Sequence, residues 1–159
     1  MKEHQNLFRD LQEDFRKMKK NLLVAQSGGP TAAINATLAG VIKQAIKEEQ
    51  IDQVYGACYG IQGVLEQKFV NLTEKVDTEE KLEKLKRTPA AALGSCRFKL
   101  NDIKEDDSQY QEIVDILHKM NIGYFVYIGG NDSMDTVAKL SAYCKEKGVE
   151  DIKVIDGPK

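Results

Sequence analysis

Apolar residues along the chain follow two patterns that alternate. Short apolar runs that end at glycine or polar residues are typical of buried strands. Apolar residues three or four positions apart are typical of helices that bury one face. The first pattern predicts strands at Asn21–Ala25, Gln53–Tyr59, Phe69–Leu72, Tyr124–Ile128 and Lys153–Ile155. The second predicts helices at Pro30–Glu49, Thr78–Arg87, Asp107–Met120 and Ser133–Lys147.

Strands separated by amphipathic helices favour parallel pairing with right-handed crossovers. We therefore expect an α/β fold, with a doubly wound, mainly parallel sheet and helices on both faces. Within it, Ser108 is the expected N-cap of its helix, and Gly148 is the residue that ends the last helix. Residues 60–63 are expected to form a turn, and residues 90–99 no regular element.

Residues 1–20 differ from the rest because they are highly charged. Phe8, Leu11, Phe15 and Met18 follow one another at spacings of 3, 4 and 3, which makes a narrow apolar stripe on a helix. We expect a charged amphipathic extension that packs on the domain or frays. A coiled-coil contact and a natural start at Met18 are the alternatives.

Composition narrows the functional classes. The chain has 159 residues, the length of one domain, and a formal net charge of -2, so it lacks the basic excess that attracts nucleic acid or anionic lipid. Three cysteines at irregular spacing and two histidines fit neither a disulfide framework nor a zinc site. No apolar run approaches the ~20 residues that span a membrane, and the first residues lack a signal peptide's apolar block. These features predict a cytoplasmic protein.

A first glycine-rich loop, Gln26–Pro30, connects the first predicted strand to a helix. Glycines allow the backbone to approach an anion closely, and the N-terminus of the following helix attracts negative charge. The loop is therefore a candidate phosphate site, with a tight strand-to-helix turn as the alternative.

A second loop, Gly129–Ser133, repeats this arrangement after Tyr124–Ile128. Its amide and carboxylate are groups that a magnesium–phosphate complex could use, although Asp132 or Ser133 could instead cap the helix. The spacing matches neither the P-loop nor GxGxxG. In a third element, Gly94–Arg97, the arginine could hold a phosphoryl group bidentately or lie free in solvent.

Together, four motifs resemble the phosphofructokinase family, in its order and at about its spacing. They are SGGPTAAINA at Ser27–Ala36, YGIQG at Tyr59–Gly63, GSCRF at Gly94–Phe98 and GGNDSM at Gly129–Met134. The resemblance covers residues 21–159 and implies the N-terminal, donor-binding part of the phosphofructokinase fold. A NAD-kinase-like or lipid-kinase-like domain is a weaker alternative, because those families share a GGD-type loop but lack the GSCRF-type element.

The resemblance implies phosphoryl transfer to the 1-hydroxyl of fructose 6-phosphate with Mg²⁺, in glycolysis, by a homodimer or homotetramer. It implies a magnesium site at Asn131 and Asp132, although asparagine replaces the usual aspartate at 131. Catalytic roles fall on Arg97, Asp132 and Lys159. The implied donor-binding residues are Gly28, Gly29, Arg97, Phe98, Gly130, Asn131, Asp132 and Ser133.

Asp132 bears on the identity of the donor. Many ATP-using members have glycine at this position, whereas pyrophosphate-using members have aspartate, whose carboxylate would crowd and repel the α-phosphate of ATP. Lys159, in Pro158-Lys159, matches a lysine of pyrophosphate-using members that could neutralise transition-state charge. We therefore expect pyrophosphate as the donor, with ATP as the alternative.

The family's catalytic base is an aspartate in a TIDND sequence directly after PK, whereas this chain ends at Lys159. We therefore expect a fragment, truncated before the catalytic loop, of an active phosphotransferase. The alternative of another class is a phosphate- or nucleotide-binding module that performs no turnover.

Overall fold

The computed structural model describes residues 1–29 and 31–158, so that Pro30 and Lys159 lie outside it. Its strands are β1 (Lys20–Gln26), β2 (Ile51–Ala57), β3 (Phe69–Asn71), β4 (Ile122–Gly129) and β5 (Lys153–Pro158). Its helices are α1 (Lys2–Met18), α2 (Ala32–Lys47), α3 (Gly60–Leu65), α4 (Leu72–Lys75), α5 (Glu79–Arg87), α6 (Ser108–Lys119) and α7 (Asn131–Glu146).

The five strands form one sheet in the order β3-β2-β1-β4-β5. Three of the four pairings are parallel, and β3 runs antiparallel to β2 at one edge. The predicted mainly parallel α/β sheet is therefore confirmed, with one short antiparallel strand added.

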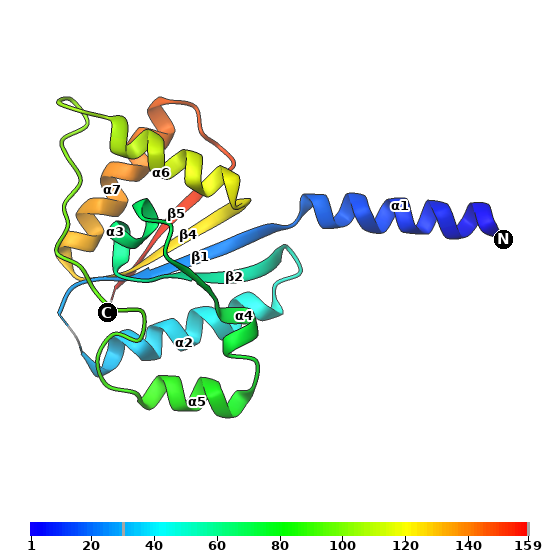
Figure 1. Cartoon of the computed structure of the whole chain (residues 1–159), viewed down its shortest axis with the longest axis horizontal. Helices are drawn as coiled ribbons and strands as arrows, with labels where there is room; N and C mark the ends of the chain where they lie inside the picture. Colours follow the sequence, from blue (N-terminus) through cyan, green and yellow to red (C-terminus); the bar gives the residue numbers. More distant parts are fainter. Residues whose placement is uncertain (30, 159) are drawn as a thin grey trace.

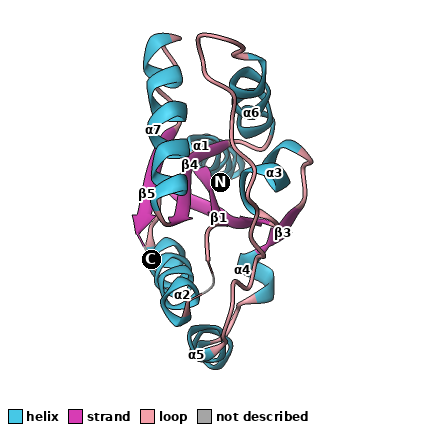
Figure 2. Ribbon diagram, turned by 90° about the vertical axis from the view of Figure 1, so that its left-hand side faces the viewer, coloured by secondary structure: helices cyan, strands magenta, loops and turns pink. Residues whose placement is uncertain are grey.

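Helices cover both faces of the sheet, with α3, α6 and α7 on one side and α2, α4 and α5 on the other (Figures 1 and 2). Strand β1 shows why both faces are buried: Leu23 and Ala25 belong to one hydrophobic cluster, and Leu22 and Val24 belong to the opposite one. Successive side chains of a strand point to opposite faces, so a continuous apolar run suits a central strand.

The connections leave the two central strands toward opposite faces of the sheet. Helix α2, which follows β1, packs on one face, and α7, which follows β4, packs on the other (Figure 1). Such a reversal opens a crevice beyond the carboxyl ends of adjacent strands. Both glycine-rich loops begin at that crevice.

Two local predictions and one alternative were wrong. Residues 60–65 form helix α3 rather than a turn. The N-cap of α6 is Asp107, and Ser108 is the first helical residue. Helix α7 begins at Asn131 with Gly130 as its N-cap, so neither Asp132 nor Ser133 caps it.

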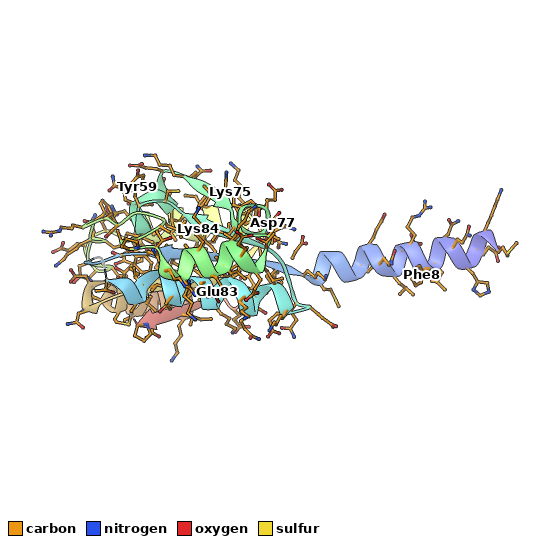
Figure 3. All side chains as sticks on the ribbon, turned by 90° about the horizontal axis from the view of Figure 1, so that it is seen from below. Phe8, Tyr59, Lys75, Asp77, Glu83 and Lys84 are labelled. Atoms are coloured by element: carbon orange, nitrogen blue, oxygen red, sulfur yellow. The ribbon has the colours of Figure 1, made fainter. Side chains whose placement is uncertain are left out.

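Helix α1 extends away from the sheet and its covering helices (Figure 1). Leu7, Phe8 and Leu11 are exposed, Phe8 at 64% and Leu11 at 57%. The expectation that the extension packs on the domain or frays stays a prediction. Figure 3 shows Phe8 on this projecting helix, far from the sheet. No helix in the described part of the chain is long and apolar enough to cross a membrane.

Candidate active site

The loop after β1 is attached to the neighbouring strand and to the 94–99 segment. The Ser27 backbone N–H donates to the Ile128 carbonyl at 2.8 Å, and its Oγ donates to the Cys96 carbonyl at 3.2 Å. The Ser95 Oγ donates to the Gly28 carbonyl at 2.9 Å. Gly28 has φ of +86°, a conformation that side chains disfavour. These bonds give the loop a fixed shape.

Gly129 allows the two glycine-rich loops to lie close together. A Cβ atom at this position would lie 2.1 Å from Ser133 Oγ and 2.7 Å from the Ser27 carbonyl oxygen. No larger residue fits without moving one of the loops. The close approach of the two loops thus depends on this glycine.

Two fully buried amide side chains hold the segment that leads into Arg97. Gln26 and Asn35 are both 0% exposed, and Gln26 Nε2 donates to Asn35 Oδ1 at 3.1 Å. Their other partners are the carbonyls of Ile34, Thr88 and Ala90 and the backbone N–H groups of Ala92 and Leu93. Residues 88–93 form no helix or strand, so these side chains replace the missing backbone ladder.

These segments line a cleft of about 710 Å³. Its lining comes from the first loop, the 95–99 segment, β4 and α7. The lining residues are Ser27, Gly28, Gly29, Ser95, Cys96, Arg97, Phe98, Lys99, Tyr127, Asp132 and Thr136.

Three charged side chains line this cleft. Lys99 Nζ lies 3.8 Å from Asp132 Oδ1, with the lysine side chain 73% and the aspartate side chain 81% exposed. Arg97 is also exposed, and none of the ion pairs among the described residues involves it. Its guanidinium is therefore available to a bound anion.

Tyr127 lies at the buried side of the cleft. Its hydroxyl accepts a hydrogen bond from the Ile61 backbone N–H at 3.2 Å. Burial raises the pKa of Tyr127 to about 12, although hydrogen bonding with Ser27 acts in the opposite direction. The phenol therefore stays protonated at neutral pH and adds no negative charge to the cleft.

The start of α7 provides a second set of polar groups. Its N-cap, Gly130, makes no side-chain capping bond, which leaves the first backbone N–H groups of a 16-residue helix without that partner. Ser133 Oγ is buried and has no hydrogen-bond partner in the described structure. Free N–H groups and the helix dipole make such a terminus favourable for phosphate oxygens.

Most of the predicted site residues meet at the cleft. Gly28, Gly29, Arg97, Phe98 and Asp132 line it. Gly130, Asn131 and Ser133 lie beside it at the start of α7, but they are not part of the described lining. The predicted Lys159 falls outside the described residues. The roles assigned to all these residues stay predictions.

Sequence reasoning missed Lys99 and Tyr127. Lys99 follows Arg97 by two positions, and exposed residues alternate with less exposed ones along residues 95–100. That alternation was a usable signal. Tyr127 belongs to a strand predicted as uniformly buried, and nothing in such a run distinguishes a residue whose hydroxyl reaches a cleft.

Most of the chain is similar to known proteins. A family model described as phosphofructokinase matches residues 21–159. The pyrophosphate–fructose 6-phosphate 1-phosphotransferase of Rhodospirillum rubrum is 44% identical over 77% of the chain, and that of Halomonas elongata is 40% identical over 80%. The crystal structure of the pyrophosphate-dependent phosphofructokinase of Nitrosospira multiformis, 36% identical, matches 86% of the chain with a TM-score of 0.77.

These matches cover only part of each relative. The chain spans 29% of the Rhodospirillum rubrum protein, 30% of the Halomonas elongata protein and 33% of the Nitrosospira multiformis chain. The similarity therefore concerns about a third of each longer protein.

Proposed function

The chain belongs to the phosphofructokinase family, and we propose that it is the donor-binding part of a pyrophosphate-dependent 6-phosphofructokinase. In the proposed reaction the 1-hydroxyl oxygen of fructose 6-phosphate attacks one phosphorus of pyrophosphate. The P–O bond to the second phosphate breaks, and the hydroxyl proton passes to a base. The products are fructose 1,6-bisphosphate and phosphate.

The cleft is the observation that supports this proposal most directly. It combines the Ser27–Gly29 loop, the exposed Arg97 guanidinium and the start of α7 within one volume of about 710 Å³. Backbone N–H groups and a guanidinium are the donors that phosphate oxygens prefer. In this arrangement Arg97 would stabilise charge on the transferring phosphoryl group.

Asp132 supports pyrophosphate rather than ATP as the donor. Its exposed carboxylate lies in the cleft lining. The family resemblance puts this position where the α-phosphate of ATP would extend. Pyrophosphate has no such group and so avoids the crowding.

We also propose that Mg²⁺ accompanies the donor. Among the described residues no group of three or more His, Cys, Asp or Glu could hold a metal ion. Mg²⁺ nevertheless fits, because it commonly binds one or two protein oxygens and takes its remaining ligands from substrate phosphates and water. Asn131 and Asp132 would supply the protein oxygens, and the ion would neutralise phosphate charge.

The sugar-phosphate contacts and the base that accepts the hydroxyl proton belong, in this proposal, to residues outside this segment. Assembly as a homodimer or homotetramer and action in the cytoplasm are parts of the same proposal.

Donor competition tests the function. The whole protein that contains this segment is assayed for fructose 1,6-bisphosphate with pyrophosphate and, separately, with ATP. We expect turnover with pyrophosphate and none with ATP. A preference for ATP would refute the donor assignment, and turnover with neither would refute the phosphofructokinase activity.

A further inference from the structure

The proposed function leaves an electrostatic problem at the cleft. Pyrophosphate is strongly anionic at neutral pH, and Asp132 places a carboxylate in the lining of the site that would receive it. Two negative groups within one cleft repel each other, and the repulsion grows as water is displaced. A residue that excludes ATP by its charge would therefore also weaken binding of the intended donor.

Lys99 lies where it can remove this conflict. Its Nζ is 3.8 Å from Asp132 Oδ1, and both side chains line the cleft. The two residues come from different elements, the 95–99 segment and the first turn of α7. Their approach is therefore a product of the fold rather than of neighbouring positions in the sequence.

Both members of the pair remain accessible to a ligand. The lysine side chain is 73% exposed and the aspartate side chain 81% exposed. A lysine ammonium has three N–H donors, so an interaction with one carboxylate oxygen leaves donors for a phosphate. Arg97, two positions earlier, is not drawn into the pair and keeps its own charge for the donor.

We propose that Lys99 is a donor-specificity residue that forms a charge-neutral pair with Asp132. The inference rests on the proposed function and deepens it. With its charge balanced by Lys99, the Asp132 side chain excludes the larger nucleotide by its volume and does not repel pyrophosphate. The net charge of the pair, rather than either residue alone, then sets the affinity for pyrophosphate.

Four proteins test this inference: the wild type, Lys99→Met, Asp132→Asn and the double variant. Each is titrated calorimetrically with pyrophosphate in metal-free buffer, so that no cation at Asp132 balances its charge in place of Lys99. Lys99→Met leaves the carboxylate unbalanced, so we expect its dissociation constant to rise about tenfold. Asp132→Asn should bind as tightly as the wild type or more tightly. The double variant restores a neutral pair and should return to within about threefold of the wild type.

Matched variants separate charge from general disturbance. Lys99→Arg keeps the charge and should bind pyrophosphate within about threefold of the wild type. Lys104 is exposed on the same stretch of chain and is not one of the described residues that line the cleft, so Lys104→Met should have no effect. Thermal melts of every variant show whether the fold is kept.

Two results would overturn the inference while the proposed function stands. The first is a double variant as weak as Lys99→Met, which would make Lys99 a simple phosphate contact. The second is a Lys99→Met variant with wild-type affinity. A wild type that does not bind pyrophosphate would contradict the proposed function, and this inference with it.

Discussion

At the scale of single residues, Asp132 decides how much room the cleft leaves beyond two phosphates. Replacing it by glycine removes the side-chain volume that opposes the α-phosphate of ATP. We expect Asp132→Gly to give measurable turnover with ATP, together with a reduced preference for pyrophosphate, in the coupled assay for fructose 1,6-bisphosphate.

Glycine also weakens a helix, by about 1 kcal/mol relative to alanine. Asp135→Gly, one turn further along α7 and outside the described lining, introduces the same penalty without opening the cleft. It should not admit ATP. If both variants use ATP equally, helix flexibility rather than Asp132 controls the donor.

Arg97 offers a second test at this scale. Arg97→Met removes the guanidinium from the cleft, and because that group would stabilise transition-state charge, we expect kcat to fall about a hundredfold. Steady-state kinetics with pyrophosphate measures the change. The exposed Arg87 on α5 provides the control, since Arg87→Met should keep kcat. An unchanged kcat in Arg97→Met would make this arginine an ordinary solvated side chain.

Tyr127 predicts a dependence of stability on alkaline pH. Its pKa in the folded protein is about 12, above the ordinary value of 10.0, so folding favours the protonated phenol. This contribution is complete below pH 10 and is lost as the pH rises toward 12. The loss should be on the order of 2 kcal/mol in the free energy of unfolding. Denaturant unfolding of Tyr127→Phe should lack this component, and identical pH profiles for both proteins would contradict the assignment.

At the scale of elements, the hydrogen bonds of Gln26 and Asn35 hold residues 88–93, which form no helix or strand, in place. Asn35→Leu removes every hydrogen bond that Asn35 makes to residues 88–92, and their part-buried backbone groups lose these partners. We expect the free energy of unfolding to fall by about 2–4 kcal/mol. Hydrogen exchange should become faster in residues 88–93 before the sheet opens. Thr37→Val, which removes one exposed bond on the same helix, should cost far less.

The sequence predicted the sheet well because its central strands are apolar on both faces. Leu22 to Ala25 form a run that fits only a strand covered on two sides, and the alternation of strands and helices then restricts the topology. The antiparallel pairing of β3 could not be predicted, because a three-residue strand contains too little pattern to give its direction.

Helix ends were the least predictable features. Ser133 has a residue type that favours an N-cap, yet in the structure its hydroxyl is buried against Gly129 and α7 begins two residues earlier. Close packing between the two loops decides this boundary, and local propensity contains no information about it. Gly60 and Gly63 suggested a turn, but Ile61 and Val64 are fully buried and give the segment enough packing to form a helix.

Those parts of the candidate site that consist of single residues within one loop could be predicted from the sequence. Gly28, Arg97 and Asp132 all lie in the cleft. The Lys99–Asp132 pair joins residues 33 positions apart, and only the fold shows that they meet. Pairings of this kind depend on the sheet and its connections rather than on local sequence.

At the scale of the whole molecule, α1 stands apart from the sheet and its covering helices (Figure 1). Because Leu7, Phe8 and Leu11 are exposed, deleting residues 1–17 should change the melting temperature by less than about 2 °C. Leu38→Ala, in the buried face of α2, serves as the destabilising reference and should cost about 2–5 kcal/mol. A large drop in melting temperature after the deletion would show that α1 packs on the domain.

Strand β5 forms an edge of the described sheet, because it pairs only with β4. The unpaired backbone groups of an edge strand can form hydrogen bonds with a strand of another molecule, which is the first step of amyloid-like aggregation. Two features weaken this tendency in β5. Lys153, Asp156 and Pro158 are exposed, and Ile155 is its one exposed large apolar side chain among the described residues. The exposed charges of Lys153 and Asp156, and the backbone N–H that Pro158 lacks, oppose pairing of this edge with another molecule. They therefore protect the chain against aggregation in concentrated solution.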